Sequence, residues 1–132
     1  MFNYLIKIEY EGTNFVGWQS QKNGKSIQDS IEKALKKVLG SKIKIIGAGR
    51  TDKGVHAYGQ SANFFCDKEI KDKYKFLGSI NFFLKRNLIS VINLSNKKLN
   101  FHAFLSLQII KFFSFMSYRS KKIIYITILI WN

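Results

Sequence analysis

Apolar side chains occupy every second position near the start of the chain: Tyr4, Ile6, Ile8 and Tyr10. The residues between them include Lys7 and Glu9, so this period of two is that of a strand with one face buried. A polar run at residues 11–14 ends the alternation. The pattern therefore predicts a strand over residues 4–10.

The next apolar pattern has helical spacing and is formed by Ile27, Ile31, Ala34, Leu35 and Val38. Ser26 can accept hydrogen bonds from the first free amides, and Asp29 places an acid in the first turn, so residues 26–29 predict a capping box. Gly40 can close the C-terminus. We also expect an ion pair between Glu32 and Lys36, one turn apart.

Three further strands and one further helix follow. Ile43 and Ile45 alternate with lysines, residues 57–65 and 89–94 read as strands, and apolar residues at 76–84 have helical spacing. The order β-α-β-β-α-β predicts an α+β, ferredoxin-like antiparallel sheet with both helices on one face and an irregular C-terminal tail. The other face would be open to a partner, although a fold alone does not establish a function.

Length and charge narrow the class of protein. A chain of 132 residues can bury one modest core. Its 22 Lys and Arg against 8 Asp and Glu give a net charge of +14, which favours a polyanionic partner, with nucleic acid ahead of a membrane. The alternative is a compositional bias of the source, with the lysines on solvated faces.

Cysteine content and the N-terminus bear on location. Cys66 is the only cysteine, so the chain cannot form an internal disulfide or a thiol-rich metal site. The first residues lack the blocks of a signal peptide, and no apolar run approaches the ~20 residues of a membrane span. We expect a soluble, cytoplasmic protein that makes no membrane contact.

Residues 49–57 read Gly-Arg-Thr-Asp-Lys-Gly-Val-His-Ala and are the most informative stretch. Arg50 and Asp52 flank Thr51, and Gly54 allows a tight reversal between extended segments. Such a turn could expose an ionised carboxylate beside a guanidinium at the rim of a sheet. Most Asp-x-Gly turns do no chemistry, so the residues alone leave both readings open.

The whole stretch resembles the active-site motif of the tRNA pseudouridine synthase A family. Further blocks resemble that family in the same order, at residues 8–13, 17–21, 26–28, 31–35, 59–60 and 101–103. The resemblance covers about residues 3–104. We therefore predict an N-terminal catalytic domain over residues 1–104 and a divergent tail over residues 105–132.

The chain departs from the family pattern in two respects. Members are typically about twice as long, with a second α/β domain, whereas the resemblance here stops after Ala103. Phe104 stands where the family has an arginine, and no residue matches the family's active-site tyrosine. Residues 105–132 contain four cations and no acid. We hypothesise a frameshift or truncation near residue 104.

The resemblance implies isomerisation of uridine to pseudouridine in the anticodon stem-loop of tRNA, without a cofactor or metal. Asp52 would be the nucleophile, and Arg50 would assist base flipping and support the charge. Thr51, Lys53, Gly54 and His56 would bind substrate. Full-length members act as homodimers, and the absent half removes the basis for expecting that assembly here. The alternatives are an inactive fragment and a non-catalytic RNA-binding module.

Several side chains also have purely structural interpretations. Arg50 could form an ion pair with Asp52, and the histidines His56 and His102 could be packed and hydrogen-bonded. Trp18 could stack on a base, although core packing beside Phe15 is favoured. The lysines Lys42, Lys44 and Lys53 could contact phosphates or be solvated, and Cys66 reads as a hydrophobic residue at a strand end.

Overall fold

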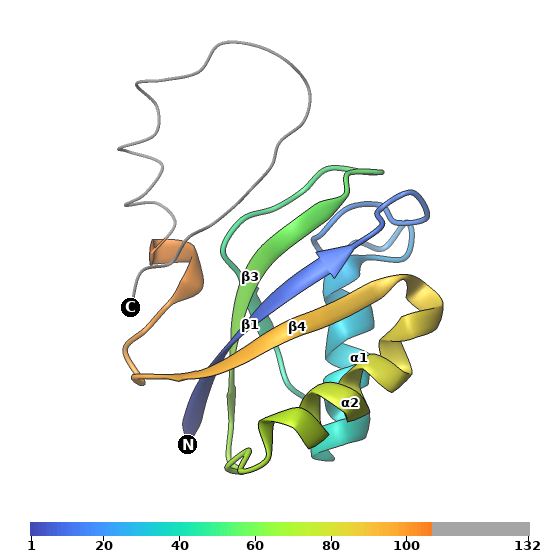
Figure 1. Cartoon of the computed structure of the whole chain (residues 1–132). Helices are drawn as coiled ribbons and strands as arrows, with labels where there is room; N and C mark the ends of the chain where they lie inside the picture. The colour runs from blue at the N-terminus through green and yellow to red at the C-terminus, as the bar shows by residue number, and fades with distance from the viewer. Residues whose placement is uncertain (107–132) are drawn as a thin grey trace.

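The structure, a computed structural model, describes residues 1–106. The strand order in the sheet is β2-β3-β1-β4, with each neighbouring pair antiparallel, and both helices cover one face (Figure 1). This arrangement confirms the predicted β-α-β-β-α-β order and the α+β class. The elements are β1 (Phe2–Tyr10), α1 (Ile27–Leu39), β2 (Ile45–Gly47), β3 (Ala57–Cys66), α2 (Lys73–Leu84), the short 3-10 helix η1 (Lys85–Asn87) and β4 (Ile89–Lys97).

The core lies between the sheet and the two helices. The alternating residues of β1 that predicted a strand, from Tyr4 to Tyr10, are all at most 4% exposed. Phe64 of β3 is fully buried, and its ring lies 5.8 Å from that of Tyr4 and 6.3 Å from that of Phe76 on α2. These contacts hold α2 against the centre of the sheet.

The ends of α1 are largely as predicted. The Ser26 hydroxyl accepts the Asp29 amide at 3.0 Å, and Gly40 takes φ 76° and donates its amide to the Lys36 carbonyl. The structure shows no reciprocal bond from the Ser26 amide to Asp29 among the described residues, and the Asp29 carboxylate accepts the Ser20 hydroxyl at 3.0 Å. Asp29 thus ties the preceding loop to the helix.

The predicted Glu32–Lys36 ion pair is wrong. Glu32 is instead paired with Lys44 at 3.2 Å, and its other oxygen accepts the Ile45 amide at 3.1 Å. The Glu32 side chain is only 11% exposed, so its carboxylate binds the backbone amide and the cation that lie beside it at the start of β2. This contact fixes the edge strand to α1.

The second strand lies two residues later than predicted. Ile43 is buried, but the ladder with β3 runs from Ile45, opposite Phe64, to Gly47, opposite Ala62. A Cβ on Gly47 would lie 2.6 Å from Trp18 Nε1, so the indole covers the end of the strand. Alternation showed which side chains point inwards, but it could not show which backbone groups pair.

Part of the other face is covered by the segment after β4. The buried amide of Asn3 donates to the carbonyls of Lys98 and Phe101, both at 2.9 Å. Asn63 donates to Asn3 at 3.1 Å and accepts the Ala103 amide at 2.9 Å. The face predicted to be open is thus partly covered. The predicted tail lies outside the described residues, apart from residues 105–106.

Candidate active site

The signature turn lies between β2 and β3, at the end of the sheet where β1 finishes. Gly54 has φ 76°, and the Val55 amide donates to the Asp52 carbonyl at 3.2 Å. The reversal predicted from Gly54 is therefore present. Asp52 and Lys53 are exposed at its tip.

Arg50 and Asp52 do not form an ion pair. Within residues 1–106, no carboxylate lies within 4.0 Å of the Arg50 guanidinium and no cation within 4.0 Å of Asp52, and neither side chain forms a hydrogen bond there. The interpretation of Arg50 as the ion-pair partner of Asp52 is therefore wrong. Both groups are accessible to a ligand.

Thr51, between them, is held by the body of the protein. Its hydroxyl shares a hydrogen bond of 2.7 Å with Tyr10, and its carbonyl accepts the Trp18 amide at 3.0 Å. Gly17 takes φ 121°, and a Cβ there would lie 2.7 Å from the Thr51 carbonyl oxygen. Burial raises the pKa of Tyr10, although the bond with Thr51 opposes that shift. Thr51 thus anchors the residue pair on either side of it.

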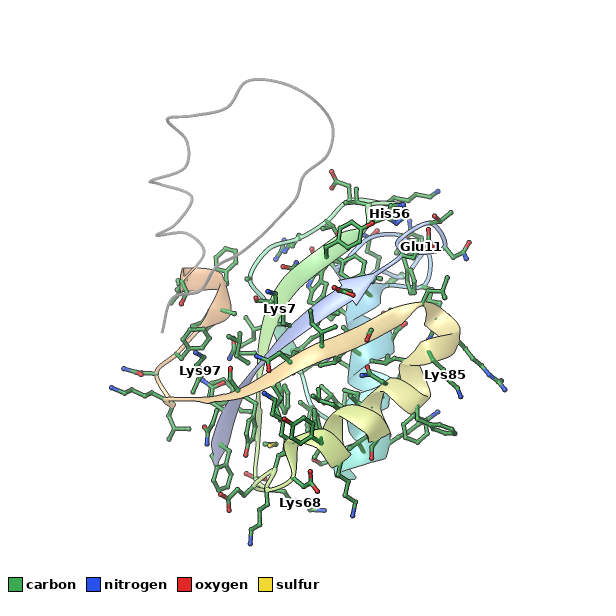
Figure 2. All side chains as sticks on the ribbon, viewed as in Figure 1. Lys7, Glu11, His56, Lys68, Lys85 and Lys97 are labelled. Carbon is green, nitrogen blue, oxygen red and sulfur yellow. The ribbon has the colours of Figure 1, made fainter. Side chains whose placement is uncertain are left out.

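His56 lies where the turn joins β3, and Figure 2 shows it beside Glu11 at the end of β1. Its Nδ1 accepts the Gly12 amide at 2.9 Å, and Glu11 Oε1 lies 3.5 Å from the same nitrogen. A Cβ on Gly12 would lie 1.9 Å from the Val55 carbonyl oxygen. The loop after β1 and the signature turn are therefore in direct backbone contact.

Two grooves flank this region. One, of about 520 Å³, is lined by His56, Glu11, Tyr58 and Lys85 among others. The other, of about 260 Å³, lies at the β2 edge and contains Arg50, Trp18, His102 and Phe104. The His102 Nδ1 atom is buried and has no hydrogen-bond partner among the described residues. The structure thus brings Arg50 and His102, far apart in sequence, to one groove.

The remaining candidates divide between core and surface. Trp18 is 3% exposed, and its ring lies 6.2 Å from that of Tyr10, which confirms the core interpretation. Cys66 is buried at the end of β3, as predicted. Lys44 is held by Glu32, whereas Lys42 and Lys53 are exposed without an ion pair among residues 1–106. Of these three lysines, Lys42 and Lys53 therefore have no charged partner among the described residues.

Sequence reasoning missed the residues that support the turn, namely Tyr10, Gly12 and Gly17. The two glycines lie within blocks that resemble the family, but periodicity gave them no role. The structural role of Asn81 was also missed. Its side-chain nitrogen donates to the Val91 carbonyl, and its side-chain oxygen accepts the Val91 amide. It joins α2 to β4 beside the larger groove.

Two features of residues 1–106 bear on cofactors and membranes. Residues 1–106 contain no group of three or more His, Cys, Asp or Glu that could hold a metal ion. No helix in that same stretch has the length and apolar character needed to cross a bilayer.

Comparison with known proteins identifies the family. The profile described as tRNA pseudouridine synthase matches residues 6–104. A tRNA pseudouridine synthase A from Pelagibacter ubique is 54% identical over 103 residues, which are 78% of this chain and 42% of that relative. A second, from Caldicellulosiruptor saccharolyticus, is 46% identical over 103 residues, 78% of this chain and 41% of the relative. The chain spans about two-fifths of the length of these relatives, and it belongs to the tRNA pseudouridine synthase family.

Proposed function

We propose that the protein isomerises uridine to pseudouridine in the anticodon stem-loop of tRNA, with Asp52 as the essential carboxylate. The observation that carries the proposal is the position of Asp52. It is exposed on a turn that Thr51, Tyr10 and Trp18 hold against the core. A carboxylate with fixed backbone and free oxygens is suited to act on a bound nucleoside.

The reaction exchanges one bond to C1′ for another. The N1–C1′ bond breaks, the uracil turns, C5 bonds to C1′, and the proton on C5 is lost while N1 gains one. Asp52 could attack C1′, attack the base, or promote elimination to a glycal. All three routes need an ionised carboxylate. The proposed chemistry involves no net redox change.

We assign Arg50 to extrusion of the base. A uridine inside a stem must leave the stack before any group can reach C1′. The Arg50 guanidinium is exposed, lines the smaller groove and has no ion pair among the described residues. A planar guanidinium can stack in the vacated space or hold a phosphate in two hydrogen bonds, which lysine does less well. We also assign to the positive charge of Arg50 the electrostatic support of the negative charge on Asp52.

Substrate contacts come from the rest of the turn. Lys53 is exposed beside Asp52 and offers a cation to a phosphate. Gly54 lets the backbone approach the RNA closely, because no side chain stands there. The Thr51 hydroxyl is already bonded to Tyr10 and His56 Nδ1 to Gly12, so these two residues contact substrate through their remaining atoms.

The proposed activity also bears on the partner, the cellular location and the assembly. The partner is tRNA, consistent with the net charge of +14, and its modification places the protein in the cytoplasm. The resemblance implies a homodimer for full-length members of the family, and we do not extend that assembly to this chain. Because the chain spans about two-fifths of its relatives, tRNA binding without turnover is the second candidate for this polypeptide.

The test is release of tritium from tRNA labelled at uridine C5, because that hydrogen leaves in the proposed reaction. Release by the wild-type chain that disappears in Asp52→Ala supports the proposal. Absence of release with tight tRNA binding indicates the binding module, and absence of both indicates an inactive fragment. Filter binding of the same tRNA by both proteins supplies the second measurement.

A further inference from the structure

The loop after β1 is held at both of its first residues. The Glu11 amide donates to the Leu88 carbonyl at 3.1 Å, and the Gly12 amide donates to His56 Nδ1 at 2.9 Å. The first bond leads to β4 and the second to the signature turn. The His56 bond is therefore a side-chain link between this loop and the residues that carry Asp52.

At the Leu88 end of this link the backbone has an uncommon conformation. Leu88 takes φ 55° and ψ 42°, a left-handed conformation that residues with a Cβ seldom adopt, and its side chain is 58% exposed. Such a residue persists where surrounding contacts determine the backbone. With Glu11 fixed there, a change in the bond at His56 has to move the turn or the Gly12 amide.

Two neighbours compete for one atom of His56. A neutral imidazole nitrogen that accepts a hydrogen bond uses its only lone pair. While Gly12 donates to Nδ1, His56 must carry its proton on Nε2, and Glu11 Oε1, 3.5 Å from Nδ1, cannot be bonded to it. Once Nδ1 is protonated the situation reverses, because the N–H binds Glu11 and Gly12 loses its acceptor.

Other charged or titratable groups lie around His56. Glu9, Tyr58 and Lys85 line the groove with it, and Asp52 and Lys53 precede it in the turn. Glu11 itself is held by the amide and hydroxyl of Thr13. The carboxylate is thus already in place to receive the imidazolium.

We propose that His56 is a positioning residue whose unprotonated Nδ1 fastens the β3 end of the signature turn to the Gly12 amide, and that protonation transfers Nδ1 to Glu11 and frees this end of the turn, while Thr51 stays bonded to Tyr10 and Trp18. The consequence for catalysis rests on the proposed function, because it concerns the placement of Asp52. The hydrogen bond between Gly12 and His56 does not depend on the proposed function.

The test compares three variants of the full chain by NMR. His56→Asn keeps an acceptor oxygen near the position of Nδ1 and does not titrate, His56→Ala removes the acceptor, and Glu11→Gln removes the competing charge. At pH 8 we expect the Nε2–H tautomer in the wild type. We expect Gly12 amide exchange roughly five- to tenfold faster in His56→Ala than in the wild type or His56→Asn. The Ile6 amide in the core reports any general loss of structure.

Lowering the pH should release the Gly12 amide in the wild type, at a lower pH in Glu11→Gln, and not in His56→Asn. An Nδ1–H tautomer at pH 8, or equal Gly12 exchange in the alanine and asparagine variants, would overturn the proposal. As the pH is lowered, tritium release should decrease more in the wild type than in His56→Asn. The NMR result decides the inference even where no tritium is released, so it fails independently of the proposed function.

Discussion

The helix-covered core and the signature turn differ in the exposure of their side chains. In the core, Phe64 and Ile6 are fully buried, and their apolar side chains make packing contacts. At the turn, Arg50 and Asp52 are exposed, whereas Thr51 between them is bonded to the body through its hydroxyl and its carbonyl. Stability and proposed chemistry thus depend on different atoms, even where the residues are adjacent.

The two regions meet at a few small residues. Gly12 and Gly17 bring the loop after β1 so close to the turn that a Cβ at either would meet a turn carbonyl oxygen. Substitutions can therefore be grouped into those that affect the core, the junction or the exposed tip. Each group should give a different combination of stability and RNA effects.

The largest expected effect on stability is in the core. Phe64→Ala removes a ring that contacts Tyr4 and Phe76, and it should lower the free energy of unfolding by about 3–5 kcal/mol. Phe82→Ala is the matched control, because that ring is 63% exposed on α2 and its removal should cost less than about 1 kcal/mol. Denaturant unfolding of both measures the difference, and equal costs would show that the core is misassigned.

A substitution at the junction should affect both properties. In Gly17→Ala the new Cβ would lie 2.7 Å from the Thr51 carbonyl oxygen, at a φ of 121° that alanine rarely adopts. We expect a loss of about 1–3 kcal/mol in the free energy of unfolding, together with weaker tritium release.

Gly78→Ala serves as the control for Gly17→Ala. This helical glycine has open space around it, so alanine should raise stability by about 0.5–1 kcal/mol. Thermal unfolding checks both proteins. If both variants were equally stable, the contact between the loop and the turn would not be what the distances indicate.

At the exposed tip, Lys53→Ala should change RNA binding without changing stability. If about six phosphates are neutralised, affinity for tRNA should fall ~10³-fold between ~50 and ~200 mM salt. Removal of one phosphate contact should make the negative slope of log affinity against log salt shallower by about one unit. Lys68→Ala, at the opposite end of the sheet in Figure 2, should leave the slope unchanged. Equal slopes in the wild type, Lys53→Ala and Lys68→Ala would show that Lys53 makes no phosphate contact with tRNA.

The smallest effect concerns alkaline pH. Burial raises the pKa of Cys66 above 9.0 and that of Tyr10 above 10.0. Since the folded state holds these protons more tightly, the unfolded chain loses them first. Their contribution to stability is complete below those unfolded values and is lost as pH rises through the folded pKa. Cys66→Ala should remove the decline that begins near pH 9.0, whereas Tyr10→Phe should remove the later one, as unfolding measured against pH will show.

Much of this fold could be predicted from local pattern, because β1 and α1 bury residues at regular spacing and Gly54 marks the reversal. The position of β2 could not, since an edge strand is defined by its partner, and Ile45 pairs with a residue far along the chain. The same limit applies to Glu32. Its preference for the Ile45 amide over Lys36 depends on how α1 packs against the sheet.

The candidate site shows a similar division. The motif identified Asp52 and Arg50 as residues to examine, and the structure places both on the surface. Their lack of an ion pair and the buried pair Asn3 and Asn63, 60 residues apart, are products of tertiary geometry. So is the bond between Gly12 and His56. No periodicity in the sequence carries information on such contacts.

The central claim is that Asp52 contributes to chemistry and not to folding, and one paired measurement on Asp52→Asn tests it. Tritium release and the free energy of unfolding are determined on the same preparation of variant and wild type. Release should fall by at least ~10³-fold, while the free energy of unfolding changes by less than ~0.5 kcal/mol. Retained release, or a loss of release that accompanies a comparable loss of stability, would contradict the account.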